Sequence, residues 1–380
     1  MSIYEEEHDL FRSSFRSWVQ AEVAPRVEEF EKAGVMDRQV YVEAGKHGFT
    51  GMAIPEEFGG GGSNDFRFNA VIGEEIAYAG LGGGGNGLGL HNDICSPYFI
   101  EYCNEEQSAR WLPGIASGEL ITAIAMTEPG TGSDLQGIAT TAVRDGDEWV
   151  INGAKTFITN GINSDLVIVV CKTHPDGGPT GMSLLIVERG MAGFERGRNL
   201  DKIGQHSADT AELFFDEVRV PHSNMLGEEG QGFAYLGFNL AQERLSIGVT
   251  GLAAAEAALN WTVDYVKERT AFGQSISNFQ NTKFELADIS TEIAVTRPFM
   301  EQCITELNAD TLSPAQAARS KLWGSELQNR VIDRCLQLFG GYGYMTEYPI
   351  GQAYVDARIA TIYGGTSEIM KTIISKDVLS

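Results

Sequence analysis

A glutamate on an apolar helical stripe is the first candidate for chemistry in this chain. Glu243 follows Leu236 and Leu240 and precedes Ile247 and Gly251, at the spacing that places side chains on one face of a helix. A carboxylate on such a face loses hydration, and this desolvation raises its pKa towards that of a general base. The pattern therefore makes Glu243 a candidate base.

Two structural interpretations of the same pattern stay open. Glu243 could pair with Arg244, or the apolar stripe could end at the protein surface. Because adjacent helical residues point about 100° apart, an intimate pair of these neighbours is not automatic.

Two segments rich in backbone donors could bind a ligand. Gly364, Gly365 and Thr366 follow a short apolar run and precede an amphipathic helix, and a backbone nest at a helix start can hold an anion. The turn itself carries no ionisable side chain. The loop "AMTEPGTGSD", residues 125–134, has the small and hydroxyl residues that suit a flat heteroaromatic ring with a phosphate tail, although an ordinary helix-to-strand turn would look the same.

The elements that must position these groups fall into three segments, 1–120, 121–226 and 227–380. The first and third show helical periodicity, and the second is rich in β-branched and aromatic runs. We therefore predict an α+β fold with an N-terminal helical domain, a central antiparallel β domain and a C-terminal four-helix bundle. The fourth helix of the bundle is the tail after Thr366.

Two Asn-Gly pairs stand in the central segment, Asn152–Gly153 and Asn160–Gly161. Asn-Gly is the strongest short signal for a tight hairpin turn, so both pairs predict hairpins.

A glycine run formally matches the dinucleotide motif GxGxxG at Gly82, Gly84 and Gly87. A helical pattern precedes it, whereas the nucleotide-binding motif requires a strand there. We interpret the run as a connection between two helices.

Bulk properties exclude several function classes. The chain has 380 residues, 43% of them hydrophobic, and a formal net charge of −24, which disfavours binding to nucleic acid. The five cysteines are scattered, and the histidines form no ligand pair, so no metal site is expected. The N-terminus does not resemble a signal peptide, and no apolar run is long enough to span a membrane, so we expect a cytoplasmic protein.

Seven sequence blocks, in order and over nearly the whole chain, resemble the acyl-CoA dehydrogenase family. They are "AIAMTEPGTGSDLQGIATTA", "INGAKTFITNG", "DTAELFFDEVRVP", "GFNLAQERLSI", "VKERTAFGQSISNFQ", "LQLFGGYGYMTEYPI" and "AYVDARIATIYGGTSEIMK". The resemblance implies an FAD enzyme of lipid metabolism and fatty acid β-oxidation. Such an enzyme converts a saturated acyl-CoA into a trans-2-enoyl-CoA, as a carboxylate removes the α-proton and the β-hydrogen leaves as hydride to flavin N5.

The resemblance also assigns residues to cofactor and substrate. The implied FAD contacts are Met126, Thr127, Gly132 and Ser133 in the loop; Phe157, Ile158 and Thr159 against the flavin ring; Arg269, Phe272 and Gln280 reaching from a neighbouring subunit; Gln337, Gly340 and Gly341 on the adenosine side; and Thr366 and Glu368 after the turn. The implied substrate contacts are Ser133, Arg244, Gly364 and Gly365. Many relatives carry tryptophan where Phe157 stands.

The position of the base distinguishes branches of the family. Most medium- and short-chain relatives carry it as Glu in a "YEGT" turn, where this chain has Gly364 in "YGGT". Relatives similar to the long-chain and isovaleryl-CoA enzymes place it on the helix in an "ERL" context, and this chain has "AQERLSI". The resemblance is therefore to the long-chain branch, with Glu243 as the base and the N–H of Gly364 as a donor to the thioester carbonyl.

The resemblance further implies a homotetramer that passes electrons to electron-transferring flavoprotein. Two other functions on the same scaffold remain open: a flavin oxidase or monooxygenase, and a non-catalytic flavin-bearing binding protein. The charge of −24 and the presence of Glu243 count against the binding protein.

Overall fold

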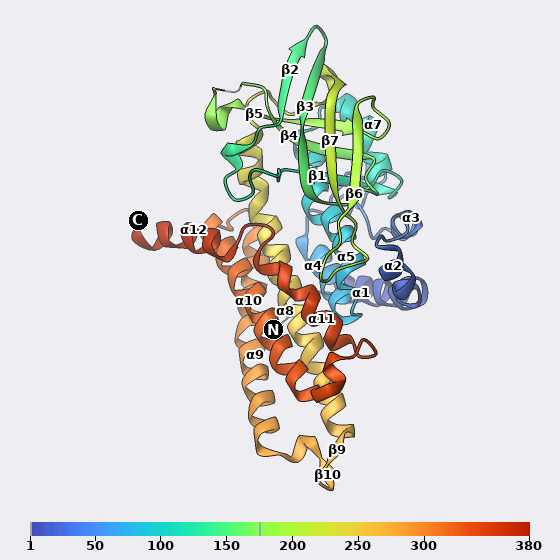
Figure 1. Ribbon diagram of the computed structural model, residues 1–380, viewed down its shortest axis with the longest axis vertical. Coiled ribbons are helices and arrows are strands. Elements are labelled where there is room, and N and C mark those ends of the chain that lie inside the picture. The colour runs from blue at the N-terminus through green and yellow to red at the C-terminus, as the bar shows by residue number, and fades with distance from the viewer. Residues whose placement is uncertain (1, 175) are drawn as a thin grey trace.

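The computed structural model of the chain describes residues 2–174 and 176–380. Helices form both ends of the chain and strands form its middle, so that a β domain lies at one end of an elongated molecule and long helices extend to the other end (Figure 1). The change from helices to strands falls between Ala116 and Thr122, and the change back falls between Leu226 and Gly232.

Between residues 2 and 120 the structure shows seven α-helices, with short π- and 3-10 segments between them. They are α1 (Glu6–Trp18), α2 (Val27–Ala33), α3 (Arg38–Lys46), α4 (Phe66–Tyr78), α5 (Gly82–Gly89), α6 (Ser96–Tyr102) and α7 (Glu105–Ala116). Helix α7 begins at a capping box, in which the Asn104 side chain accepts a hydrogen bond from the N–H of Gln107 and the Gln107 side chain accepts one from the N–H of Asn104.

The glycine run forms helix α5 itself, so its interpretation as a connection was wrong. Glycine is a poor helix former, but here it allows close packing. A Cβ on Gly85 would lie 2.1 Å from Cγ2 of Ile76, and one on Gly87 would lie 2.4 Å from the hydroxyl of Tyr41. Contact with neighbouring elements therefore overrides the local preference.

The central segment forms one sheet in the order β6-β7-β3-β2-β4-β5-β8, with β1 paired to β4. The strands are β1 (Thr122–Ala125), β2 (Thr141–Asp145), β3 (Glu148–Thr159), β4 (Leu166–Lys172), β5 (Met182–Glu188), β6 (Phe194–Asn199), β7 (Thr210–Pro221) and β8 (Met225–Leu226). Most pairs are antiparallel as predicted, but β4 pairs in parallel with both β1 and β2.

Neither Asn-Gly pair forms a hairpin turn, so that prediction was wrong. Asn152 and Gly153 lie inside β3 at a bulge, where the Asn152 side chain accepts a hydrogen bond from the N–H of Glu217 at 2.9 Å. Asn160 and Gly161 form a turn after β3, and the next strand, β4, pairs with β5 instead of β3. In both places contacts with distant parts of the chain decide the conformation.

Strand β4 is buried on both faces and joins two cores. Leu166, Ile168 and Val170 pack against the N-terminal helices, in a cluster that includes Tyr98 of α6. The alternate side chains Val167, Val169 and Cys171 pack into the core of the β domain. This two-sided burial holds the N-terminal helices against the sheet.

The C-terminal segment consists of three long helices, two shorter ones and a small hairpin. They are α8 (Gly232–Glu268), β9 (Thr270–Ala271), β10 (Gln274–Ser275), α9 (Gln280–Asn308), α10 (Pro314–Phe339), α11 (Pro349–Ala357) and α12 (Ser367–Leu379). The core among α8, α9 and α10 includes Ile350 and Ala357 of α11. Helix α12, predicted as the fourth bundle helix, instead extends sideways from α10 (Figure 1), and its buried residues are Ser367 and Met370, at its start.

Glycines bring α8 and α10 into backbone contact. A Cβ on Gly248 would lie 2.7 Å from the carbonyl oxygen of Ser320, and one on Gly251 would lie 2.7 Å from that of Gly324. This close crossing brings Lys321 of α10 next to the part of α8 that follows Glu243.

Candidate active site

Glu243 lies on α8 and is 3% exposed, so the apolar stripe does not end at the surface. The hydroxyl of Tyr98, on α6, donates a hydrogen bond to Oε1 of Glu243 at 3.0 Å. Arg244 does not form a direct ion pair with Glu243, and its buried Nε has no hydrogen-bond partner among the described residues. Of the two structural interpretations of the stripe, neither holds.

Burial determines the acidity of this carboxyl group. Desolvation raises the pKa of Glu243 to about 7, although the hydrogen bond from Tyr98 and the charge of Arg244 act in the opposite direction. Burial also lowers the pKa of Arg244, which the charge of Glu243 partly offsets. A carboxyl group with this pKa can both accept and release a proton near neutral pH.

The glycine turn lies beside the same face of α8. A Cβ on Gly364 would lie 2.4 Å from Cδ1 of Ile247, one helical turn beyond Glu243. Gly364 has φ +62° and Gly365 has φ +100°, a conformation that glycine adopts without strain. The structure therefore brings together the two positions at which the sequence suggested a base could stand, and only one of them carries a carboxylate.

A buried lysine holds this turn in place. Lys321 of α10 is fully buried, and its ammonium group donates a hydrogen bond to the carbonyl oxygen of Gly365 at 2.7 Å. Burial, helped by the positive charge of Arg244, lowers the pKa of Lys321 to about 8. After the turn, Thr366 caps α12 by accepting a hydrogen bond from the N–H of Ile369, and Glu368 is exposed in the first turn of that helix.

A buried ion pair shapes the loop of residues 125–134. Nζ of Lys155 lies 2.9 Å from Oε1 of Glu128 and donates a second hydrogen bond to the carbonyl oxygen of Met126 at 3.0 Å. The N–H of Thr156 donates to the carbonyl oxygen of Thr127 at 2.9 Å. Met126 and Thr127 are thus held against β3 with partly exposed side chains, whereas Gly132 and Ser133 lie in the exposed part of the loop.

The end of β3 presents Phe157 to solvent. Phe157 has φ +60° and is 68% exposed, in the irregular part of the pairing between β3 and β7. Ile158 is buried in the core of the β domain, so its predicted flavin contact can involve only its backbone. Thr159 is half-buried.

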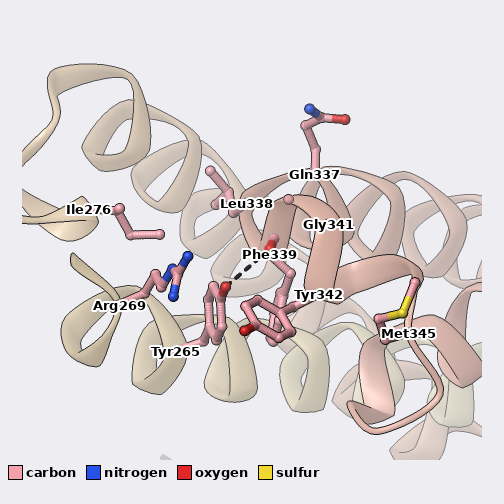
Figure 2. A pocket seen from close by; sticks show the side chains of 10 residues that line it. Tyr265, Arg269, Ile276, Gln337, Leu338, Phe339, Gly341, Tyr342 and Met345 are labelled. Atoms are coloured by element: carbon pink, nitrogen blue, oxygen red, sulfur yellow. Dashed lines mark hydrogen bonds between the residues drawn. The ribbon is translucent and has the colours of Figure 1, made fainter. Parts of the chain in front are cut away.

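A pocket of about 460 Å³ lies at the C-terminal ends of helices α8 and α10 (Figure 2). The pocket is lined by Arg269, at the end of α8, and by Gln337, Gly340 and Gly341, at the end of α10. The Arg269 guanidinium lies 5.3 Å from the ring centre of Tyr342. The hydroxyl of Tyr265 donates to the carbonyl oxygen of Phe339 at 3.1 Å and fixes one wall.

The predicted FAD contacts thus form two groups, one in the β domain and at the start of α12, and the other around the end of α8 and the β9–β10 hairpin (Figure 1). Arg269 follows Glu243 by 26 residues, which corresponds to about 39 Å of α-helix. Phe272, at the tip of the β9–β10 hairpin, is 96% exposed, and Gln280, the first residue of α9, is also exposed. In one chain, the residues assigned to the ring and those assigned to the adenosine side do not meet.

Comparison with known proteins identifies the family. Three family models match in order: the acyl-CoA dehydrogenase N-terminal domain over residues 5–119, its middle domain over 123–218 and its C-terminal domain over 230–379. The chain belongs to the acyl-CoA dehydrogenase family. This confirms the resemblance inferred from the sequence blocks.

Individual relatives cover the whole chain. The mitochondrial long-chain specific acyl-CoA dehydrogenase of Sus scrofa is 48% identical over 379 residues, which are 99% of this chain and 87% of the relative. The crystal structure of acyl-CoA dehydrogenase from Geobacillus kaustophilus matches with a TM-score of 0.97 and 47% identity over 100% of both chains. A structure described as electron transferring flavoprotein of Acidaminococcus fermentans matches with a TM-score of 0.95 and 35% identity, also over 100% of both chains.

As a member of this family, the chain is an FAD-dependent oxidoreductase of acyl-CoA. The structure offers groups that fit FAD: a pocket with three aromatic rings and a guanidinium at one end of α8, and a partly exposed loop anchored by Lys155 near the other end. The comparisons do not favour an oxidase, a monooxygenase or a non-catalytic binding protein. Among the described residues, no helix has the length and apolar character needed to cross a membrane.

Three residues near the site escaped the sequence analysis: Tyr98, Lys321 and Lys155. Tyr98 left no signal, because a tyrosine in a helix is ordinary and its partner is 145 residues away. Lys321 and Lys155 did leave a signal. Lys321 falls between Ala317 and Gly324 on the buried face of α10, and Lys155 alternates with core positions of β3.

Proposed function

We propose that this acyl-CoA dehydrogenase removes the α-proton of a saturated acyl-CoA with Glu243 and forms a trans-2-enoyl-CoA. The observation that carries the proposal is a buried carboxylate on α8, one helical turn before Ile247, which packs against the carboxylate-free glycine turn. FAD, when bound, supplies the acceptor for the β-hydrogen, which leaves as hydride.

Glu243 accepts the α-proton in a site that excludes water. Because its pKa is raised to about 7, the carboxylate is a stronger base than an exposed glutamate, yet most of it is ionised at pH 8. Arg244 supplies a fixed positive charge beside it, and this charge favours the ionised form before the proton moves.

The turn supplies the complementary acid function. A thioester α-proton becomes removable when preorganised donors hydrogen-bond to the carbonyl oxygen. We assign this role to the N–H of Gly364, with Gly365 and Ser133 as further substrate contacts. The hydrogen bond from Lys321 to the Gly365 carbonyl keeps the turn rigid, so that the donor needs little reorganisation during the reaction.

We infer that a second copy of the chain completes each FAD site. Arg269 and its pocket lie 26 residues beyond Glu243 along α8, so this pocket would not serve an FAD bound beside Glu243 of the same chain. An exposed Phe272 beside this pocket suits a contact with another subunit. This supports a homotetramer in which Arg269, Gln337, Gly340 and Gly341 bind the adenosine side of a neighbour's FAD, with electron-transferring flavoprotein as the acceptor of the electrons.

A panel of saturated acyl-CoAs, from short to long chains, tests the proposal. Each is mixed anaerobically with the FAD-loaded protein while flavin absorbance and enoyl-CoA are followed. The proposal requires flavin bleaching with an equal amount of enoyl-CoA for at least one member, and slow reoxidation by air. A fully FAD-loaded protein that no member reduces would refute it.

A further inference from the structure

The hydroxyl of Tyr98 is the hydrogen-bond donor that touches the Glu243 carboxylate. The bond to Oε1 is 3.0 Å long, and both residues are buried. Within residues 2–174 and 176–380 it is the only hydrogen bond that the Glu243 side chain makes. Oε2 therefore has no protein partner in the described part of the chain.

The surrounding packing holds Tyr98 firmly. Its ring belongs to the core between helices α6–α7 and the sheet. Tyr98 and Tyr102 have ring centres 6.3 Å apart, and Tyr102 stacks on Tyr235 of α8 at 3.8 Å. The side chain of Asn239, one turn before Glu243, donates a hydrogen bond to the Tyr102 hydroxyl. Aromatic contacts thus fix α6 against α8 on the N-terminal side of Glu243.

The titratable and charged groups around Glu243 come from four elements. Tyr98 on α6 and Cys95 in the π-helical segment before it face the carboxylate from one side, and Arg244 adjoins it on α8. Across the helix crossing, the positive charge of Arg244 helps to lower the pKa of Lys321 on α10. Burial and the charge of Glu243 hold the pKa of Tyr98 well above its usual value, so Tyr98 stays a protonated donor throughout the neutral range.

We propose that Tyr98 is a positioning residue that occupies one oxygen of the base and leaves the other free for the substrate. The proposal rests on the function assigned to Glu243 above. With Oε1 held by the Tyr98 hydroxyl, the side chain keeps one rotamer, and the α-proton of the acyl-CoA is transferred to Oε2. The electron pair of the broken α C–H bond becomes the new Cα–Cβ double bond as the β-hydrogen leaves with its own pair to FAD.

The same bond has a consequence for acidity that can be measured. A hydrogen bond to the charged form favours that form, so removal of the donor makes the carboxylate harder to ionise. Tyr98→Phe keeps the ring and its packing and removes only the hydroxyl. Because a hydrogen bond to a charged group has the strength of about one pKa unit or more, we expect the pH midpoint of kcat/KM to rise by about one unit. The plateau rate should also fall by about 10-fold, since the rotamer of the base is no longer fixed.

Tyr102→Phe is the matched control. It removes a hydroxyl from the same helix, one turn away, that contacts Asn239 instead of the base. Its midpoint should equal that of the wild-type protein, with each variant compared at equal FAD content. A Tyr98→Phe protein with the wild-type midpoint and plateau would overturn the proposal, as would an equal upward shift in Tyr102→Phe.

Two further measurements separate the possible failures. If Glu243→Gln is as active as the wild type, the base assignment itself fails, whereas an inactive Glu243→Gln with an unaltered Tyr98→Phe refutes the role of Tyr98 alone. If Tyr98→Phe does not fold, a ring-fluorinated tyrosine at position 98 replaces it. Its more acidic hydroxyl donates a stronger hydrogen bond, so the midpoint must move to lower pH, and an unchanged midpoint contradicts the proposal.

Discussion

The pH dependence of kcat/KM follows directly from the burial of Glu243. A base must be ionised to accept a proton, and the pKa of this carboxyl group is raised to about 7 by desolvation. At pH 6 about one-tenth of the enzyme then carries the carboxylate, and at pH 8 about nine-tenths does. We therefore expect kcat/KM to rise about 10-fold between pH 6 and pH 8.

Initial rates at low acyl-CoA concentration, with an artificial electron acceptor, measure this profile for the free enzyme. A glutamate with an ordinary pKa of about 4.5 would be almost fully ionised at pH 6, and the profile between pH 6 and pH 8 would be flat. A flat profile, or a midpoint below about pH 5, would therefore refute the claim that the base is desolvated.

The same raised pKa of Glu243 also predicts how folding stability depends on pH, which can be measured without FAD and without turnover. Because the folded state holds the Glu243 proton more tightly than the unfolded state, the contribution of Glu243 to folding stability is fully present below pH 4.5 and is lost as pH rises through 7. The difference of about 2.5 units corresponds to about 3 kcal/mol. Glu243→Gln cannot ionise at this position, so the wild type should lose stability relative to Glu243→Gln between pH 5 and pH 8. A constant difference in unfolding temperature would contradict the assignment.

Three further substitutions test the parts that surround the base. Gly364→Ala should lower the unfolding free energy by about 1–3 kcal/mol in urea titrations, because φ is +62° and the new methyl group meets Cδ1 of Ile247. An additional Ile247→Val should recover the part of this loss that is steric. An unchanged unfolding free energy in Gly364→Ala would refute the contact. Lys155→Met should lower the unfolding free energy by about 3–5 kcal/mol and reduce FAD retention, because it leaves the Glu128 carboxylate buried without its partner. An additional Glu128→Gln should restore part of the lost stability. If nothing is restored, the unpaired charge of Glu128 is not the cause of the loss. Arg269→Gln should lower the flavin content after gel filtration but leave the pH midpoint of the remaining holoenzyme unchanged, and full flavin retention would remove this pocket from the cofactor site.

Periodicity predicted the parts of the site that depend on local sequence. Glu243 could be found because an apolar stripe is repeated every three to four residues along one helix, and burial of that stripe is what raises the pKa. The glycine turn could be found because positive φ angles require glycine at Gly364 and Gly365. Both features follow from the covalent order of the chain.

Contacts between distant segments could not be predicted in this way. The Asn-Gly pair at 152–153 looks like a hairpin, but a hydrogen bond to Glu217 on another strand turns it into a bulge. Gly85 lies in a helix despite the low helix propensity of glycine, and Ile76 on the neighbouring helix α4 leaves no room for a side chain there. Tyr98 reaches Glu243 only after α6 has packed on α8, and no spacing in the sequence encodes that approach.

The reduction of bound flavin by Glu243→Gln tests the central claim most directly. The variant keeps the size of the side chain and is loaded with FAD to the same extent as the wild type. Both are mixed anaerobically with an acyl-CoA that reduces the wild type, and flavin bleaching is followed by stopped flow at pH 8. The account predicts bleaching about 100- to 10,000-fold slower in the variant, as expected when a general base is lost. Bleaching at the wild-type rate would show that another group removes the proton.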